Sequence, residues 1–218
     1  MRSLSIYLSV IFIIAACSAE KTTEKQKFPK LGRPEVVEKM VDGELVQDTV
    51  PHRIHAYKLI NQDSNWVTPK TMEGKVYVAD FFFTSCPTIC PTMKKQMLRV
   101  YEAYKDNDEV GIISHTIDPE YDTVPLLKDF SERLGVQAPK WNFVTGTKDE
   151  IYELGQKGYM VTAMEDENEE GGYIHSGAFI LVDKERHVRG VYDGTMEEDV
   201  DRLIKDIPQL LATYQKTE

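Results

Sequence analysis

Two cysteines in this 218-residue chain, Cys86 and Cys90, have the spacing and setting for thiol redox chemistry or for binding a soft metal ion. The nearly continuous apolar run Val76–Phe83 precedes them and predicts a strand buried on both faces. Pro91 then opens a helical pattern, since proline suits the first position of a helix. The pair therefore lies where a strand leads into a helix. The positive end of the helix dipole favours thiolate over thiol at such a place.

The C-x-x-x-C spacing of Cys86 and Cys90 allows both sulfurs to converge on a single ion, because positions i and i+4 share one face of a helix. Soft thiolates select Cu(I), and imidazole is a good third ligand. Zinc is the competing ion, but a structural zinc site normally has a fourth Cys or His ligand. A purely structural disulfide is disfavoured, since two cysteines so near in sequence close only a small loop.

The elements that must position this pair form a β–α alternation after the cysteine-bearing helix. Helices are predicted to begin at Thr123, at the capping box Thr147–Glu150 and at the capping box Thr195–Glu198. Strands are predicted at Val110–Thr116, Trp141–Val144, Ala178–Val182 and His187–Tyr192. This order of elements is the thioredoxin-like one. It predicts an α/β fold with a mixed central sheet flanked by helices, preceded by an N-terminal extension.

A third metal ligand would come from one of the five histidines, and His175 is the candidate. It precedes the strand predicted at Ala178–Val182, and in thioredoxin-like folds the loop before that strand packs against the start of the cysteine-bearing helix. Redox members of that fold keep a cis-proline in this loop, whereas here the loop has a histidine and no proline. We interpret the remaining histidines as surface or core residues: His52, His55, His115 and His187.

The N-terminus has the pattern of an export signal. Residues 1–16 combine a positive start, an apolar stretch and small residues before Cys17, and predict a signal peptide. The placement of Cys17 resembles the lipobox of bacterial lipoproteins, which implies that Cys17 becomes the lipidated first residue. Residues 17–48 are then expected to be a tether and irregular extension, with a small hairpin as the alternative within Phe28–Val50, and residues 49–214 the folded domain.

The net charge of the chain bears on two kinds of partner, nucleic acid and membrane lipid. The net charge of −10 argues against binding nucleic acid. It gives no sign of electrostatic adhesion to anionic lipid either, so we expect membrane association to depend on the lipid anchor. The expected location is the bacterial cell envelope, facing the periplasm.

Three motifs in order resemble the Sco/SenC family of copper-binding assembly factors. They are Cys86-Pro87-x-x-Cys90-Pro91, the segment Ile117–Thr123, and the lone His175 before a strand–turn–strand, within a resemblance that covers roughly Thr49–Leu211. The resemblance implies a thioredoxin-like fold that binds copper, as Cu(I) or Cu(II), through Cys86, Cys90 and His175. It also implies a role in delivering copper to subunit II of cytochrome c oxidase, or in reducing the thiols there.

One departure concerns a further ligand. Many members of that family carry an Asp immediately before the histidine, whereas this chain has Ile174. No oxygen ligand for Cu(II) is therefore expected at that position.

These observations favour a copper metallochaperone over an enzyme, with cytochrome c oxidase subunit II or another copper-receiving protein as its partner. The main alternative is a thiol–disulfide oxidoreductase in which Cys86 and Cys90 form a redox-active pair, working with thiol–disulfide reductants. A peroxidase of the thioredoxin-like superfamily is the third interpretation. A lipoprotein whose cysteines form only a structural disulfide is the fourth.

We expect mass spectrometry of membrane-extracted protein to find a lipid-modified peptide that begins at Cys17. Cys17→Ser should abolish the modification, because serine has no thiol to acylate. An unmodified N-terminus at another residue, together with release of the protein by salt, would contradict the lipobox interpretation.

Overall fold

The computed structural model describes residues 28–41, 43–165 and 173–215. The expected signal peptide, Cys17 and the first part of the tether lie outside these residues. None of the described helices is both long enough and apolar enough to cross a membrane.

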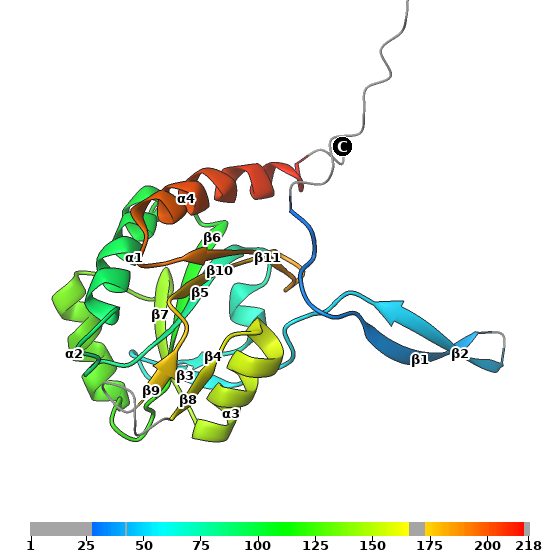
Figure 1. Ribbon diagram of the computed structural model, residues 1–218, viewed down its shortest axis with the longest axis horizontal. Helices are drawn as coiled ribbons and strands as arrows, with labels where there is room; N and C mark the ends of the chain where they lie inside the picture. The colour runs from blue at the N-terminus through cyan, green and yellow to red at the C-terminus, as the bar shows by residue number, and fades with distance from the viewer. Residues whose placement is uncertain (1–27, 42, 166–172, 216–218) are drawn as a thin grey trace, which may run out of the picture.

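A seven-stranded mixed sheet forms the centre of the domain, with the strand order β11-β10-β5-β6-β7-β3-β4 (Figure 1). The strands β5, β6 and β7 run parallel, whereas β10, β11, β3 and β4 join through antiparallel pairings. The strand bounds are β3 Leu59–Asn61, β4 Trp66–Val67, β5 Val76–Phe82, β6 Val110–Thr116, β7 Trp141–Thr145, β10 Ala178–Val182 and β11 Val188–Asp193.

Helices flank this sheet, as the predicted thioredoxin-like order requires (Figure 1). Within the domain α1 contacts α4, while α2 packs near β7. Their bounds are η1 Pro69–Met72, α1 Cys90–Tyr104, α2 Val124–Leu134, α3 Lys148–Glu153, the π-helical continuation η2 Leu154–Tyr159, and α4 Glu197–Ala212. The predicted α/β fold with a mixed, helix-flanked sheet is confirmed.

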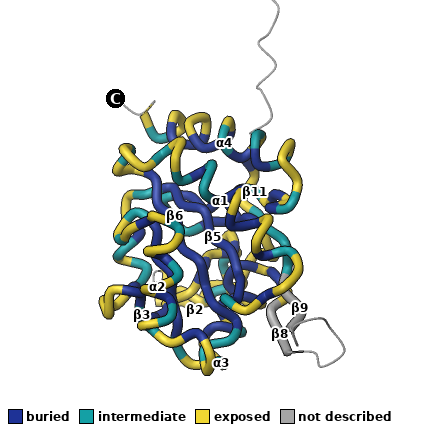
Figure 2. The backbone as a smooth tube through the Cα atoms, turned by 90° about the vertical axis from the view of Figure 1, so that its left-hand side faces the viewer, coloured by how far each residue is buried: buried dark blue, intermediate teal, exposed yellow. Residues whose placement is uncertain are grey.

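The two central strands are buried along their whole length. Every residue of β5 and of β6 is buried, and Figure 2 shows both strands as continuous dark traces. On α1, Met93, Met97 and Val100 are fully buried against this sheet. The sequence prediction of a strand covered on both faces is therefore confirmed, although β5 ends at Phe82.

Two of the predicted helix boundaries are confirmed and one is wrong. The capping box Thr147–Glu150 begins α3, and Thr123 is the N-cap residue of α2, a helix that Gly135 ends in the left-handed conformation. The last helix does not begin with Thr195 as its cap; its N-cap residue is Met196. The backbone N–H and the hydroxyl of Thr195 both donate to the Asp193 carboxylate, so Thr195 belongs to the preceding turn.

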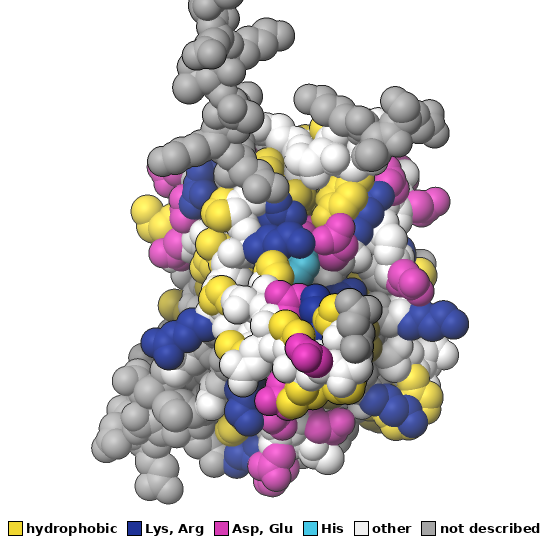
Figure 3. Space-filling view, turned by 90° about the vertical axis from the view of Figure 1, so that its right-hand side faces the viewer, with side chains coloured by type: hydrophobic (Ala, Val, Ile, Leu, Met, Phe, Trp, Pro, Cys, Tyr) yellow, Lys and Arg dark blue, Asp and Glu magenta, His cyan; other side chains and the backbone are white. Residues whose placement is uncertain are grey.

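The N-terminal extension contains a β-hairpin of β1, Glu35–Val41, and β2, Glu44–Val50 (Figure 1). It projects from the domain, and most of its residues are exposed. Figure 3 views the molecule from the side on which this hairpin projects. Hydrophobic side chains lie beside acidic and basic ones on that face. The division expected between residues 48 and 49 stays a prediction, and β2 continues through it to Val50.

A second small hairpin lies just before β10. It pairs β8, Ala163–Glu165, with β9, Tyr173–His175, in antiparallel register. Ala163 stands opposite His175, so the register fixes the backbone of this histidine at the end of β9.

Candidate metal centre

Cys86 and Cys90 come together in the loop that joins β5 to α1. Their side chains are 7% and 5% exposed, and both are thiols. The two sulfur atoms interact with each other, and the Cys86 sulfur lies 3.5 Å from the Thr88 hydroxyl. Both cysteines line a cavity of 210 Å³ together with Phe83, Thr84, Pro91, Lys94, Phe130 and Leu134. The predicted convergence of the two sulfurs is therefore present.

The two thiols have different acidities. Burial acts to raise the pKa of Cys86, but hydrogen bonds from the Thr88 hydroxyl and from the N–H groups of Cys90 and Thr88 outweigh it, so this pKa is lowered. At Cys90 burial dominates and raises the pKa to about 12, against the opposing charge of Lys94. The prediction that the helix start favours thiolate holds for Cys86. It is wrong for Cys90, because burial destabilises a thiolate there by more than the start of the helix stabilises it.

A buried carboxylate holds the backbone just before the cysteines. Asp122 is fully buried, and it accepts hydrogen bonds from the Thr84 N–H at 3.1 Å and from the Thr84 hydroxyl. The Thr116 hydroxyl, at the end of β6, donates to the same carboxylate at 2.5 Å. Asp122 therefore ties the start of the cysteine loop to the neighbouring strand. Sequence reasoning missed this role, although Asp122 lies inside the Ile117–Thr123 motif.

The segment that contains His175 runs beside the cysteine loop. Gly177, two residues after His175, approaches Ile89 so closely that an added Cβ would lie 3.6 Å from the Ile89 Cδ1 atom. The backbone N–H of Ser176 donates to the Thr162 carbonyl at 3.2 Å, which holds the segment to the opposite arm of the small hairpin. The predicted packing of this loop against the start of α1 is confirmed at the level of the backbone, and the ligand role of the imidazole stays a prediction.

The sequence model of the SCO1/SenC family matches residues 47–212 of this chain. The chain belongs to the SCO1/SenC family. The match spans the central sheet, the cysteine loop and the segment of His175.

Solved structures of this family share the fold. A SCO1/SenC family lipoprotein from Bacillus anthracis str. Ames is 29% identical, with a TM-score of 0.67 over 73% of this chain and 95% of that one. BsSco, described as a Sco-family cytochrome c oxidase assembly protein with a disulfide switch, is 32% identical, with a TM-score of 0.65 over 73% and 93%. Arabidopsis thaliana ScoI with copper bound is 28% identical, with a TM-score of 0.61 over 73% and 98%.

None of the remaining four histidines of this SCO1/SenC member lines the cysteine cavity. His52 contacts the Gly158 carbonyl at 2.8 Å, and His187 contacts the His52 carbonyl at 2.7 Å. His115 is fully buried in β6 and stacks on Phe81, and His55 is exposed. Their interpretation as surface or core residues is confirmed.

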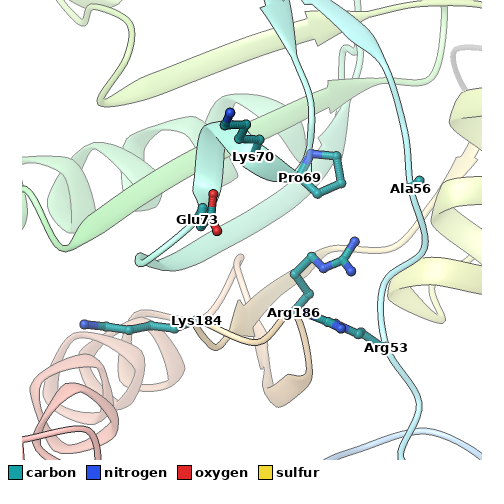
Figure 4. Close-up of a pocket in the computed structure, with 7 residues that line it drawn as sticks. All are labelled: Arg53, Ala56, Pro69, Lys70, Glu73, Lys184 and Arg186. Carbon is teal, nitrogen blue, oxygen red and sulfur yellow. The ribbon is translucent and has the colours of Figure 1, made fainter.

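A larger hollow of 430 Å³ lies at the other end of β5, where η1 meets the turn after β10 (Figure 4). Basic side chains surround it, and neither cysteine nor histidine lines it: the lining residues are Arg53, Ala56, Pro69, Lys70, Glu73, Lys184 and Arg186. Figure 4 shows the lysines spread around the hollow rather than converging, and Lys184 is paired with Glu109 at 2.5 Å. This hollow offers no soft ligand, so the metal centre must be sought at the cysteines.

The donors that the structure brings together suit a soft ion. Two neighbouring sulfurs at a largely apolar cavity match the preference of Cu(I) for thiolates and for few ligands. Among the described side chains, no three His, Cys, Asp or Glu residues form a ready metal site. A third ligand is therefore sought in the adjoining segment of His175.

We predict that removing the Asp122 carboxylate destabilises the domain and loosens the cysteine loop. Asp122→Ala leaves buried donors of Thr84 and Thr116 unpaired, so the free energy of unfolding should fall by about 3 kcal/mol. Urea unfolding measures this change. Asp129→Ala, an exposed carboxylate on α2, is the control and should change it by less than about 0.5 kcal/mol. Equal stabilities of the two variants would contradict the anchoring role.

We also predict that iodoacetamide modifies Cys86 before Cys90 at neutral pH. Alkylation follows the thiolate fraction, and the lower pKa and slightly greater exposure of Cys86 both favour its reaction first. The rate at Cys86 should level off at a lower pH than that of an ordinary thiol. The rate at Cys90 should still rise far into the alkaline range, as its pKa of about 12 requires.

Peptide mapping after limited alkylation of reduced protein distinguishes the two sites. Protein unfolded in guanidinium is the control, and there the two cysteines should react alike. Equal rates in the folded protein would contradict the prediction, because they would show that the two thiols do not differ in pKa.

Proposed function

We propose that this chain is a copper metallochaperone that contributes to assembly of the copper centre of cytochrome c oxidase. Cys86 and Cys90 are its thiolate ligands and His175 its imidazole ligand. The observation that carries the proposal is the contact between two buried sulfurs at one small cavity. Copper-bound ScoI from Arabidopsis thaliana, and the description of BsSco as an oxidase assembly protein, support the same assignment.

The environment of the sulfurs suits holding copper and then transferring it. Apolar side chains of Phe83, Phe130 and Leu134 line the cavity, which limits water around the ion and favours the monovalent state. The Thr88 hydroxyl and the backbone N–H groups of the loop stabilise the Cys86 thiolate. A site with few ligands and an exposed flank can pass its ion to the thiols of a partner by ligand exchange. The partner we propose is subunit II of the oxidase or another copper-receiving protein.

The proposed location is the bacterial cell envelope, with the domain held at a membrane by lipid on Cys17 and facing the periplasm. The apolar stretch and small residues before Cys17 support this proposal. The similar protein from Bacillus anthracis is described as a lipoprotein, which supports it further.

A thiol–disulfide oxidoreductase is the second candidate, favoured by the unequal pKa values of the two cysteines. In that reaction the Cys86 thiolate attacks a target disulfide and releases one target thiolate, forming a mixed disulfide. Cys90 then loses its proton and displaces the second target thiol. The products are a reduced target and a Cys86–Cys90 disulfide, which a thiol reductant must reopen. The disulfide switch described for BsSco is consistent with such a pair.

Replacing His175 distinguishes the two candidates. A chaperone loses a ligand in His175→Ala, so its Cu(I) affinity should fall by at least about 10–100-fold, the loss typical of even an outer contact to a metal. Competition with a chelator under anaerobic conditions measures that affinity. The rate at which the variant reduces a model disulfide should change much less, because that chemistry uses the two cysteines alone.

The matched control is His55→Ala, which removes an exposed histidine outside the site and should bind copper like wild type. If His175→Ala keeps wild-type copper affinity but loses dithiol reactivity, the imidazole serves as an acid–base partner of the cysteines. The oxidoreductase then becomes the better assignment.

A further inference from the structure

Lys94 is a buried lysine that lines the cysteine cavity. It follows Cys90 by one turn of α1, is 4% exposed, and lines the 210 Å³ cavity together with both cysteines. Its charge is close enough to act on the Cys90 sulfur. Buried lysines are rare unless they are paired, so the partner of Lys94 decides what its charge does.

That partner lies behind the lysine, away from the cavity. The Lys94 Nζ atom is 2.6 Å from Asp80 Oδ2 and 3.3 Å from the Ser114 hydroxyl. Asp80 is fully buried within β5 and does not line the cavity. Of the two ions, Lys94 is therefore the one that lines the cavity, where its positive charge acts on Cys90, while Asp80 stays in the sheet.

Neighbouring residues fix this orientation. The Ser114 hydroxyl donates to the second oxygen of Asp80, and it accepts a hydrogen bond from the Trp141 indole N–H at 2.9 Å. The Lys94 ammonium also lies 4.0 Å from the centre of the Phe82 ring. The low local dielectric among these buried groups strengthens the interactions of the Lys94 charge with its surroundings.

The charge of the loaded site depends on the ion that it holds. Two thiolates with a monovalent ion carry a net charge of −1, whereas the same thiolates with a divalent ion are neutral; a neutral imidazole changes neither sum. A fixed positive charge stabilises the first complex, which is negatively charged, and has much less effect on the second, which is neutral.

We propose that Lys94 is a specificity-determining residue that makes the cysteine pair prefer a monovalent soft ion over a divalent one. Asp80, Ser114 and Trp141 are the positioning residues that hold its charge at the cavity. This inference rests on the proposed function, because it concerns the ion held between Cys86 and Cys90. It assigns to one side chain a selectivity that two thiolates lack by themselves, since thiolates also bind Zn(II) well.

The test compares Cu(I) and Zn(II) affinities of the reduced full chain by chelator competition under anaerobic conditions. Lys94→Met removes the charge and keeps the length of the side chain. It should lower the Cu(I) affinity by about tenfold, the order expected for one nearby charge at an effective dielectric of about 20 with its carboxylate still present. Its Zn(II) affinity should stay level or rise. Lys95→Met, which removes the exposed neighbouring charge on the same helix, is the matched control and should leave both affinities unchanged.

Two further variants protect the test from a folding defect. Lys94→Met combined with Asp80→Asn leaves no unpaired buried charge, and it should show the same lowered ratio of Cu(I) to Zn(II) affinity. Asp80→Asn alone removes the carboxylate that holds the buried ammonium in place, so it should lower this ratio as well. Circular dichroism and thermal unfolding report whether each variant is folded.

Equal losses of Cu(I) and Zn(II) affinity in the Lys94 variants would overturn the inference, because a merely structural role moves both affinities together. An unchanged ratio in all folded variants would overturn it as well. Wild-type protein that fails to bind Cu(I) would overturn the proposed function itself. That failure is distinct, since it appears before any substitution is made.

Discussion

The site depends on the position of β5, a central strand that is buried on both faces and paired with β10 on one side and β6 on the other. Its register is fixed by pairing on both sides, with Ala79 opposite both Ile180 and Ile113. Because a shift by one residue would turn every side chain to the other face, this strand cannot slip. The chain therefore leaves the sheet after Phe82 at a defined point, and the Asp122 carboxylate holds Thr84 immediately beyond it. These contacts fix the position at which the cysteine loop begins.

The same strand brings a charge into the core. Asp80 faces α1 from the middle of an otherwise apolar run, and burying it without a partner would cost several kcal/mol, on the order of the penalty for a desolvated ion. Lys94 supplies the partner from α1, so the pair links the strand that ends before the cysteines to the helix that begins with one of them. Strand, loop and helix thus form one unit, which contains both sulfurs and the Thr88 hydroxyl that contacts one of them.

The sequence was sufficient to predict the elements with a strong hydrophobic period. It was not sufficient to predict the contacts between elements. The run from Val76 and the helical pattern after Pro91 identified the strand, the helix and the cysteine loop, because burial dictates those patterns locally. The acidity of Cys90 depends on how deeply α1 packs, which no local pattern encodes. The predicted cap at Thr195 was wrong for a similar reason, because the Thr195 hydroxyl and backbone N–H donate to Asp193 instead of taking part in the cap. The pairing of Lys94 with Asp80 joins residues 14 apart and was visible only in the fold.

The start of the described chain and the cysteine cavity lie at opposite ends of β5. Arg189 pairs with Asp183 at 2.6 Å, and its guanidinium Nε donates to the Phe28 carbonyl at 3.0 Å, which fixes the start of the described chain near the turn after β10. Asp183 follows Val182, whose partner on β5 is Tyr77, whereas the cysteines follow the far end of that strand. Seven residues of strand span roughly 23 Å at about 3.3 Å per residue. The described N-terminal segment therefore joins the domain at the end of β5 that lies away from Cys86, and the contacts that hold it there are separate from those that position the cysteine loop.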